Sequence, residues 1–185
     1  MMRAMLNFAR FGRDRRGVSA IEFALVAPVM VGLYLGCVEL SDGIAVDRKV
    51  SLTAAALANL TSESTSLSTT DMTNIFNAAS AIIQPYSASN MKMTVSCLSI
   101  DANKNVSTAW SSNSTNGGVT GTVTVPADLK VASTQLILAQ VTYAYKPIVG
   151  YTISGTLTLA DQMFMMPRIT APTYTDASNT ANKCG

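Results

Sequence analysis

Residues 18–38 form a long apolar run, and this run constrains the architecture of the chain more than any other feature. A helix over this stretch, at about 1.5 Å per residue, is about as long as the hydrocarbon core of a bilayer is thick. We therefore expect a transmembrane helix. The run contains two residues that are costly in such a helix, the carboxylate of Glu22 and the imino acid Pro28, and each calls for a physical reason.

The residues before this run are strongly basic. Residues 1–17 carry five arginines and one aspartate, a formal charge of +4, so the rest of the chain accounts for −2 of the total of +2. The positive-inside rule then places the N-terminus in the cytoplasm and the rest of the chain on the other side of the membrane. A composition of 48% hydrophobic and only 13% charged residues is low in charge for a soluble protein.

Composition also argues against several classes of function. The chain has no histidine and, after the apolar run, no basic patch, which disfavours Ser-His-Asp or Cys-His catalysis, most zinc sites and nucleic-acid binding. Asp101, Asp128 and Asp161 lie near predicted turns or strand ends, where aspartate usually caps or is solvated. We therefore expect a protein that is not an enzyme and has no catalytic residues, no cofactor and no metal.

Three ordinary export signals compete for the apolar run. A secretory signal peptide would use the small residues at 43–45, but the run is longer than the 7 to 15 residues usual for its core. A lipoprotein signal would use residues 35–37, but Tyr34 occupies a position that prefers an aliphatic residue. A twin-arginine signal would use Arg15 and Arg16, but the residues that follow do not continue that pattern.

A fourth interpretation accounts for more residues. Gly17 and the six residues after it, VSAIEF, resemble the prepilin peptidase site of type IV pilins, in which cleavage after a glycine leaves a mature chain with glutamate fifth. The continuation EFALVAP from Glu22 to Pro28, with the later Glu39 and Leu40, is similar to the TadE-like family of minor pilins or pseudopilins of the tight-adherence (Tad) pilus system.

This resemblance implies a structural subunit of the bacterial cytoplasmic (inner) membrane, cut between Gly17 and Val18 by a prepilin peptidase. Its partners would be other pilins or pseudopilins, the Tad assembly machinery and membrane lipid. The alternative from another class is a single-pass, membrane-anchored binding protein or adhesin that does not enter a filament.

Glu22 has a physical role if the chain is cut. Cleavage before Val18 creates an α-ammonium within about one helical turn of the Glu22 carboxylate, on this chain or on a neighbour. Such a pair would favour docking of helices in register. The alternative is an interfacial acid that reaches the headgroups without a further role.

The other candidate docking residues concern helix packing. Pro28 removes one backbone hydrogen bond, a loss tolerated in lipid where neighbouring helices satisfy the freed group. Gly32 and Gly36 have the G-x-x-x-G spacing that permits close helix contact, although this spacing is common by chance. With Glu22 and Phe23, these residues form the predicted docking set.

Beyond the membrane we expect an α+β protein in which a spine helix continues to residue 60, followed by a Ser/Thr linker at 61–70 and a head domain at 71–185. The head should contain a short helix capped by Asp71, then an antiparallel sheet. The expected strands cover residues 91–100, 106–111, 119–125, 135–145 and 152–159, with 162–168 extending or ending the last strand and a loose tail after it.

The three cysteines divide between the two parts of the chain. Cys97 and Cys184 lie in the predicted head, on the oxidising side of the membrane, where disulfides persist. We predict that they pair and hold the tail, which leaves Cys37 in the membrane as a free, inert thiol.

Overall fold

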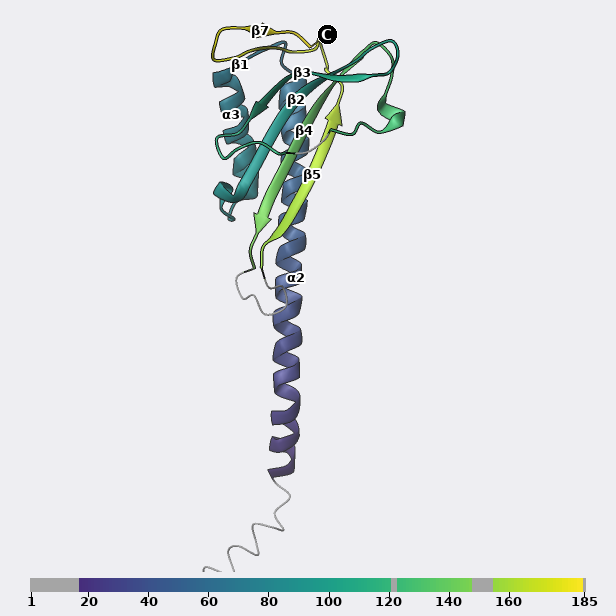
Figure 1. Ribbon diagram of the computed structural model, residues 1–185. Helices are drawn as coiled ribbons and strands as arrows, with labels where there is room; N and C mark the ends of the chain where they lie inside the picture. Colours follow the sequence, from purple (N-terminus) through teal and green to yellow (C-terminus); the bar gives the residue numbers. More distant parts are fainter. Residues whose placement is uncertain (1–16, 121–122, 148–154, 185) are drawn as a thin grey trace, which may run out of the picture.

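The computed structural model describes residues 17–120, 123–147 and 155–184, and it contains one long helix with a small domain at one end. The helix, α2 (Val18–Ser62), has 45 residues and is therefore about 67 Å long. Its C-terminal part packs against the head, and its N-terminal part extends away from it (Figure 1). The predicted basic leader lies outside the described residues, apart from Gly17.

The main sheet of the head has four antiparallel strands in the order β3-β2-β4-β5. These strands are β2 (Met91–Ile100), β3 (Val106–Asn113), β4 (Thr134–Tyr145) and β5 (Leu157–Met165). Helix α2 packs across β4 and β5 and also contacts α3 (Thr69–Ser80). The predicted α+β class, with a long N-terminal helix, a short helix and an antiparallel sheet, is confirmed.

A second, smaller sheet joins segments that we expected to be irregular. It consists of β1 (Ser66–Ser68), β6 (Thr173–Thr175) and β7 (Ala181–Asn182), with β1 and β6 parallel. The expected linker at 61–70 is therefore structured, because α2 runs through Ser62 and β1 and the start of α3 occupy the rest. The C-terminal tail pairs with this segment.

The start of α3 also differs from our prediction. Its N-cap is Ser68, whose hydroxyl accepts a hydrogen bond from the backbone N–H of Asp71 at 3.1 Å. The Asp71 carboxylate in turn accepts from the backbone N–H of Ser68 at 2.9 Å. Asp71 is thus the third helical residue of a capping box, three positions after the true cap.

Two of the expected strands differ from the structure. The described residues of the segment 119–125 form no strand, and Val125 instead packs against the outer face of the sheet. The last strand begins at Leu157 rather than at residue 152 and includes residues 162–165; residues 152–154 of the prediction lie outside the described part. Three short 3₁₀ turns complete the described elements: η2 (Ala81–Ile83), η3 (Ala88–Asn90) and η4 (Ala127–Leu129).

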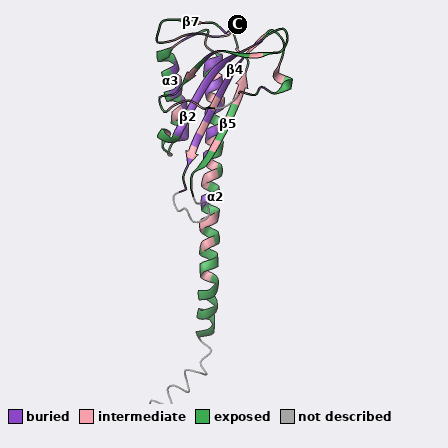
Figure 2. Cartoon of the chain, viewed as in Figure 1, coloured by how far each residue is buried: buried purple, intermediate pink, exposed green. Residues whose placement is uncertain are grey.

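The core lies between α2, α3 and the inner face of the sheet. Every second residue of β2 from Met91 to Cys97 points into it, as a strand with one covered face requires. On α2 the buried positions recur at helical spacing, at Val46, Val50 and Leu57. A smaller cluster around Leu98 and Leu138 lies on the outer face. Figure 2 shows burial confined to the head half of the molecule.

Candidate functional site

The N-terminal half of α2 is the candidate functional site, because it exposes large apolar side chains and none of its apolar window is buried by the head. Among the residues that the structure describes, α2 is the one helix long and apolar enough to cross a membrane. Figure 2 shows this half exposed for several turns. The exposed large side chains from Val18 to Val38 are Val18, Ile21, Phe23, Leu25, Val26, Val29, Met30, Val31, Leu33, Tyr34 and Val38.

The predicted processing residues lie at the first turn of α2. Gly17 is the N-cap residue, with φ −85° and ψ −12°, a conformation open to any residue. A Cβ built on Gly17 would meet nothing within 4 Å. Among the residues that the structure describes, nothing therefore requires a glycine at this position.

Four of the five predicted docking residues, Glu22, Pro28, Gly32 and Gly36, lie within one sector of about 120° around the helix, and Phe23 points away from it. Glu22 and Phe23 are exposed one turn into the helix. At 100° per residue, Glu22 and Pro28 point about 120° apart. The helix continues through Pro28, whose nitrogen cannot donate to the carbonyl of Ala24.

A shallow groove runs along one side of α2 in this half. It is lined by Ala24, Ala27, Pro28, Val31, Gly32 and Leu35. A Cβ on Gly32 would meet nothing within 4 Å, so the space beside this glycine is open. The groove brings together Pro28 and Gly32 of the predicted set, whereas Gly36 does not line it.

The groove lies on the side of α2 that the head covers higher up. Three buried residues continue the line of Gly32 along the helix. The successive spacings from Gly32 are 7 residues to Glu39, 7 more to Val46 and 11 more to Leu57, and each is close to a whole number of helical turns. A helix that entered the groove would therefore lie directly beneath the head of this subunit.

Glu39 is a site residue that the sequence analysis named only as part of the family motif and did not include in the docking set. It lies directly after the apolar run, yet only 3% of its side chain is exposed. The base of the head covers it, close to Tyr145. Burial raises the pKa of Tyr145, with further contributions from the carboxylates of Asp42 and Glu39, and burial together with Asp42 raises the pKa of Tyr86. The sequence signal for Glu39 was its position, seven residues before Val46, the first core residue of α2 in the head.

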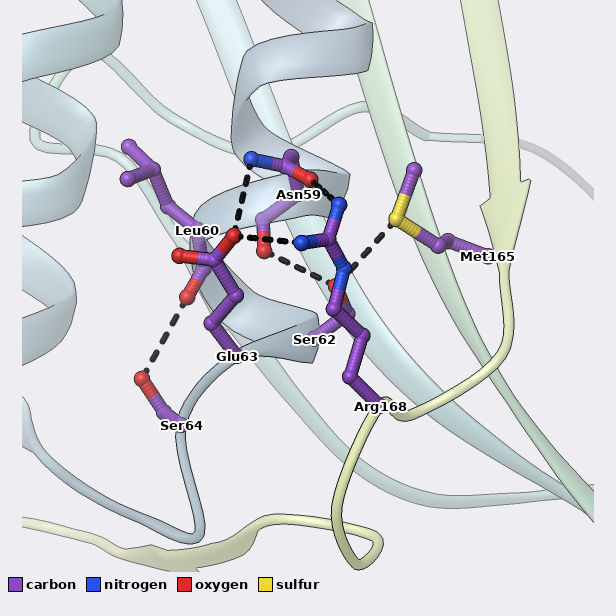
Figure 3. A network of polar contacts seen from close by, with 7 residues as sticks. All are labelled: Asn59, Leu60, Ser62, Glu63, Ser64, Met165 and Arg168. Carbon is purple, nitrogen blue, oxygen red and sulfur yellow. Dashed lines mark hydrogen bonds and ion pairs between the residues drawn. The ribbon is translucent and has the colours of Figure 1, made fainter.

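The other end of α2 is fastened to the sheet by a polar network (Figure 3). Arg168, which follows β5, forms an ion pair with Glu63 at 2.8 Å and also donates to the side-chain oxygen of Asn59. Its backbone N–H donates to the carbonyl of Ser62 at 3.0 Å. The ion pair is exposed and contributes little alone, but with the backbone bond it fixes the end of the helix.

Cys97 and Cys184 form a disulfide, with their Cα atoms 5.9 Å apart, which attaches the C-terminal residues to β2. Cys37 is free and exposed in the apolar half of α2. Both observations agree with the sequence-based division of the cysteines. Within the described residues, no group of three or more His, Cys, Asp or Glu side chains could hold a metal ion.

Comparison with known families then adds one finding. Residues 17–58 match the family model of TadE-like proteins. This TadE-like segment begins at Gly17, contains all the predicted docking residues and ends within the part of α2 that the head covers. The resemblance inferred from the motif is thereby confirmed over residues 17–58, and it points to an association with the Tad pilus system. No curated protein and no solved structure matches the chain.

Proposed function

We propose that this protein is a structural, minor pilin-like subunit that is held in the bacterial inner membrane by the N-terminal half of α2 and takes part in Tad pilus assembly. The observation that carries the proposal is the exposed apolar half of α2 within the TadE-like segment. A water-soluble protein rarely exposes so large an apolar surface, whereas lipid and neighbouring helices both cover one.

In this proposal a prepilin peptidase removes the basic leader by cleavage between Gly17 and Val18. The support is the exposed first turn of α2 and a glycine that the fold does not need. The arginines of the leader hold the N-terminus in the cytoplasm, so that the head, with its disulfide, faces the oxidising side.

The cleaved chain then docks through α2. The groove at Pro28 and Gly32 offers close approach for a partner helix, and the new ammonium of Val18 offers a partner for the Glu22 carboxylate. We propose no catalytic activity for the head.

The intact mass and N-terminal sequence of the membrane-extracted protein test this proposal. We expect a mature chain that begins at Val18. Gly17→Leu should leave the leader attached, because a side chain before the scissile bond blocks close approach, while Gly12→Leu, a second glycine of the leader, should be processed normally. A mature chain that begins at Cys37 with acyl chains, or at Val46, would overturn the pilin interpretation.

Shearing separates the proposal from its alternative. A subunit that enters a filament copurifies with sheared pili, whereas an anchored binding protein stays with the membrane. Recovery of the processed protein solely from membranes, in cells that carry pili, would favour the anchored binding protein or a role confined to the assembly complex.

A further inference from the structure

The apolar surface of the molecule does not end with the apolar run. On α2, Leu40 and Ile44 are 60% and 48% exposed, although they follow Val38 and Glu39. Leu157, the first residue of β5, is 42% exposed at the same end of the head. These three side chains, which we call the basal rim, come from two elements far apart in the sequence.

The register of the sheet places Leu157 at the level of Ile44, one helical turn above Leu40. Leu157 pairs with Tyr145 across β4 and β5, so their side chains lie on the same face of the sheet. Tyr145 in turn reaches α2: a Cβ built on Gly43 would lie 3.8 Å from its Cε1 atom. Leu157 therefore lies beside α2 at the turn that carries Gly43 and Ile44. Figure 1 shows the start of β5 beside α2.

This level coincides with the interface of the membrane that would hold α2. If the hydrocarbon core ends near Val38, Leu40 lies about 3 Å and Ile44 about 9 Å above that boundary. The headgroup region adds about 5 to 8 Å on each side of the core. Because helical side chains lean toward the N-terminus, Ile44 covers a spot lower than its own Cα.

The polar groups at this level also suit an interface. Lys146 follows Tyr145 and is exposed, and the Glu39 carboxylate is covered by the head rather than directed at lipid. A lysine beside apolar side chains favours the boundary between acyl chains and phosphates. The next exposed apolar residue of α2, Leu52, lies eight residues beyond Ile44, about 12 Å farther from the membrane.

We propose that the basal rim is a second membrane contact, in which the base of the head rests in the headgroup region of the bilayer that α2 crosses. The contact lies on two sides of the helix, with Leu157 on the side of the sheet and Leu40 and Ile44 on α2 itself. It therefore limits both the depth and the tilt of the subunit before assembly. This inference rests on the proposed membrane insertion of α2.

Depth-dependent fluorescence quenching tests the proposal. In a Cys37→Ser background, the variants Ile44→Cys, Leu52→Cys, Leu157→Cys and Val131→Cys each receive a bimane label at the new thiol, and the full chain is reconstituted in phosphatidylcholine and phosphatidylglycerol vesicles. The quencher is a phosphatidylcholine with a nitroxide on its headgroup. Leu52 is the matched control on α2, and Val131, exposed near the far end of β4, is the control in the head.

We expect at least twofold stronger quenching at Ile44 and Leu157 than at Leu52 and Val131. A label at Val26, in the middle of the apolar run, measures insertion with a nitroxide on the acyl chain. Strong quenching at Val26 with no difference between the basal rim and the controls would overturn the second contact alone. No quenching at Val26 would overturn membrane insertion, and the basal contact with it.

Discussion

The indole ring of Trp110 on β3 lies 5.2 Å from the ring of Tyr174 on β6, centroid to centroid. The Nε1–H of Trp110 also donates a hydrogen bond of 3.0 Å to the carbonyl oxygen of Pro172. Both rings are buried. The C-terminal segment is thus part of the core of the head and is not a loose extension.

Trp110→Phe should destabilise the protein by about 1 to 3 kcal/mol, because it leaves the buried carbonyl of Pro172 without its donor. Urea unfolding of the full chain in detergent micelles, followed by far-UV circular dichroism, measures the change. The exposed substitution Thr108→Ser on the same strand is the control and should stay within about 0.5 kcal/mol. A Trp110→Phe variant as stable as this control would show that the hydrogen bond does not hold the tail.

Replacing the Cys97 and Cys184 pair by alanines should also loosen the tail. The bridge closes a loop with a sequence separation of 87, and the chain-entropy model gives up to about 4.5 kcal/mol for a loop of that order. Thermal unfolding of the double variant should occur at a lower temperature, and limited proteolysis should cut first near the C-terminus. Cys37→Ser should change neither measurement, and an equal loss in that variant would contradict the assignment.

The capping box predicts how stability depends on pH. Hydrogen bonds from Ser68 lower the pKa of the Asp71 carboxyl below its ordinary value near 3.8. A carboxyl whose pKa is lower in the folded than in the unfolded state contributes stability that is present above the unfolded pKa and is lost as the pH falls through the folded pKa. Ser68→Ala should therefore lower the free energy of unfolding at neutral pH. It should also reduce the further loss of stability that the wild type shows as the pH falls below about 4. Unfolding midpoints of the wild type and the variant, measured between pH 2 and 6, test this. The same pH dependence in both proteins would contradict the pairing of Ser68 with Asp71.

Glu22→Gln tests the proposed docking. It keeps the shape and removes the charge, and its ammonium partner forms only after cleavage, so processing should be normal. Incorporation into a multi-subunit complex should weaken by about 1 to 3 kcal/mol, the range for a charge-assisted hydrogen bond. Quantitative copurification with sheared filaments measures this, with Asp47→Asn, at an exposed position of α2 outside the apolar half, as the control for charge loss alone. Normal assembly of Glu22→Gln would leave the pilin interpretation intact and remove this role for Glu22.

Sequence patterns predicted the parts of the fold that depend on local periodicity. The strand at 91–100 was predicted with the bounds that the structure gives it, because its residues alternate between apolar and polar from Met91 to Cys97 and, with the phase shifted by one, from Leu98 to Ile100. The segment at 119–125 looked similar, but Val125 covers an apolar cluster on the sheet without joining it. A β-like composition does not tell a strand from a loop that packs on one.

The small sheet could not be predicted in this way. Its strands have two or three residues, and Ser66 pairs with Thr173 across more than a hundred residues of sequence. Such short strands carry no periodic signal, so the linker and the tail looked irregular. The capping box was readable, since Ser68 precedes Asp71 by three positions, but the polar run around it hid the cap.

The candidate site was likewise predictable where it depends on composition alone. The docking set could be read from the apolar run and the family motif, whereas the burial of Glu39 depends on the base of the head folding back along α2. The basal rim depends on the pairing of Leu157 with Tyr145, which no local pattern specifies.

A single helix supplies both the membrane half of this molecule and a wall of its core. A load applied to the head therefore passes to the membrane half along one continuous series of backbone hydrogen bonds, with no hinge between the two. The series lacks one bond, where Pro28 cannot donate, and the helix is most easily bent there. Under tension the subunit should behave as a stiff rod with one compliant point inside the bilayer, so that its head turns and tilts with the helix.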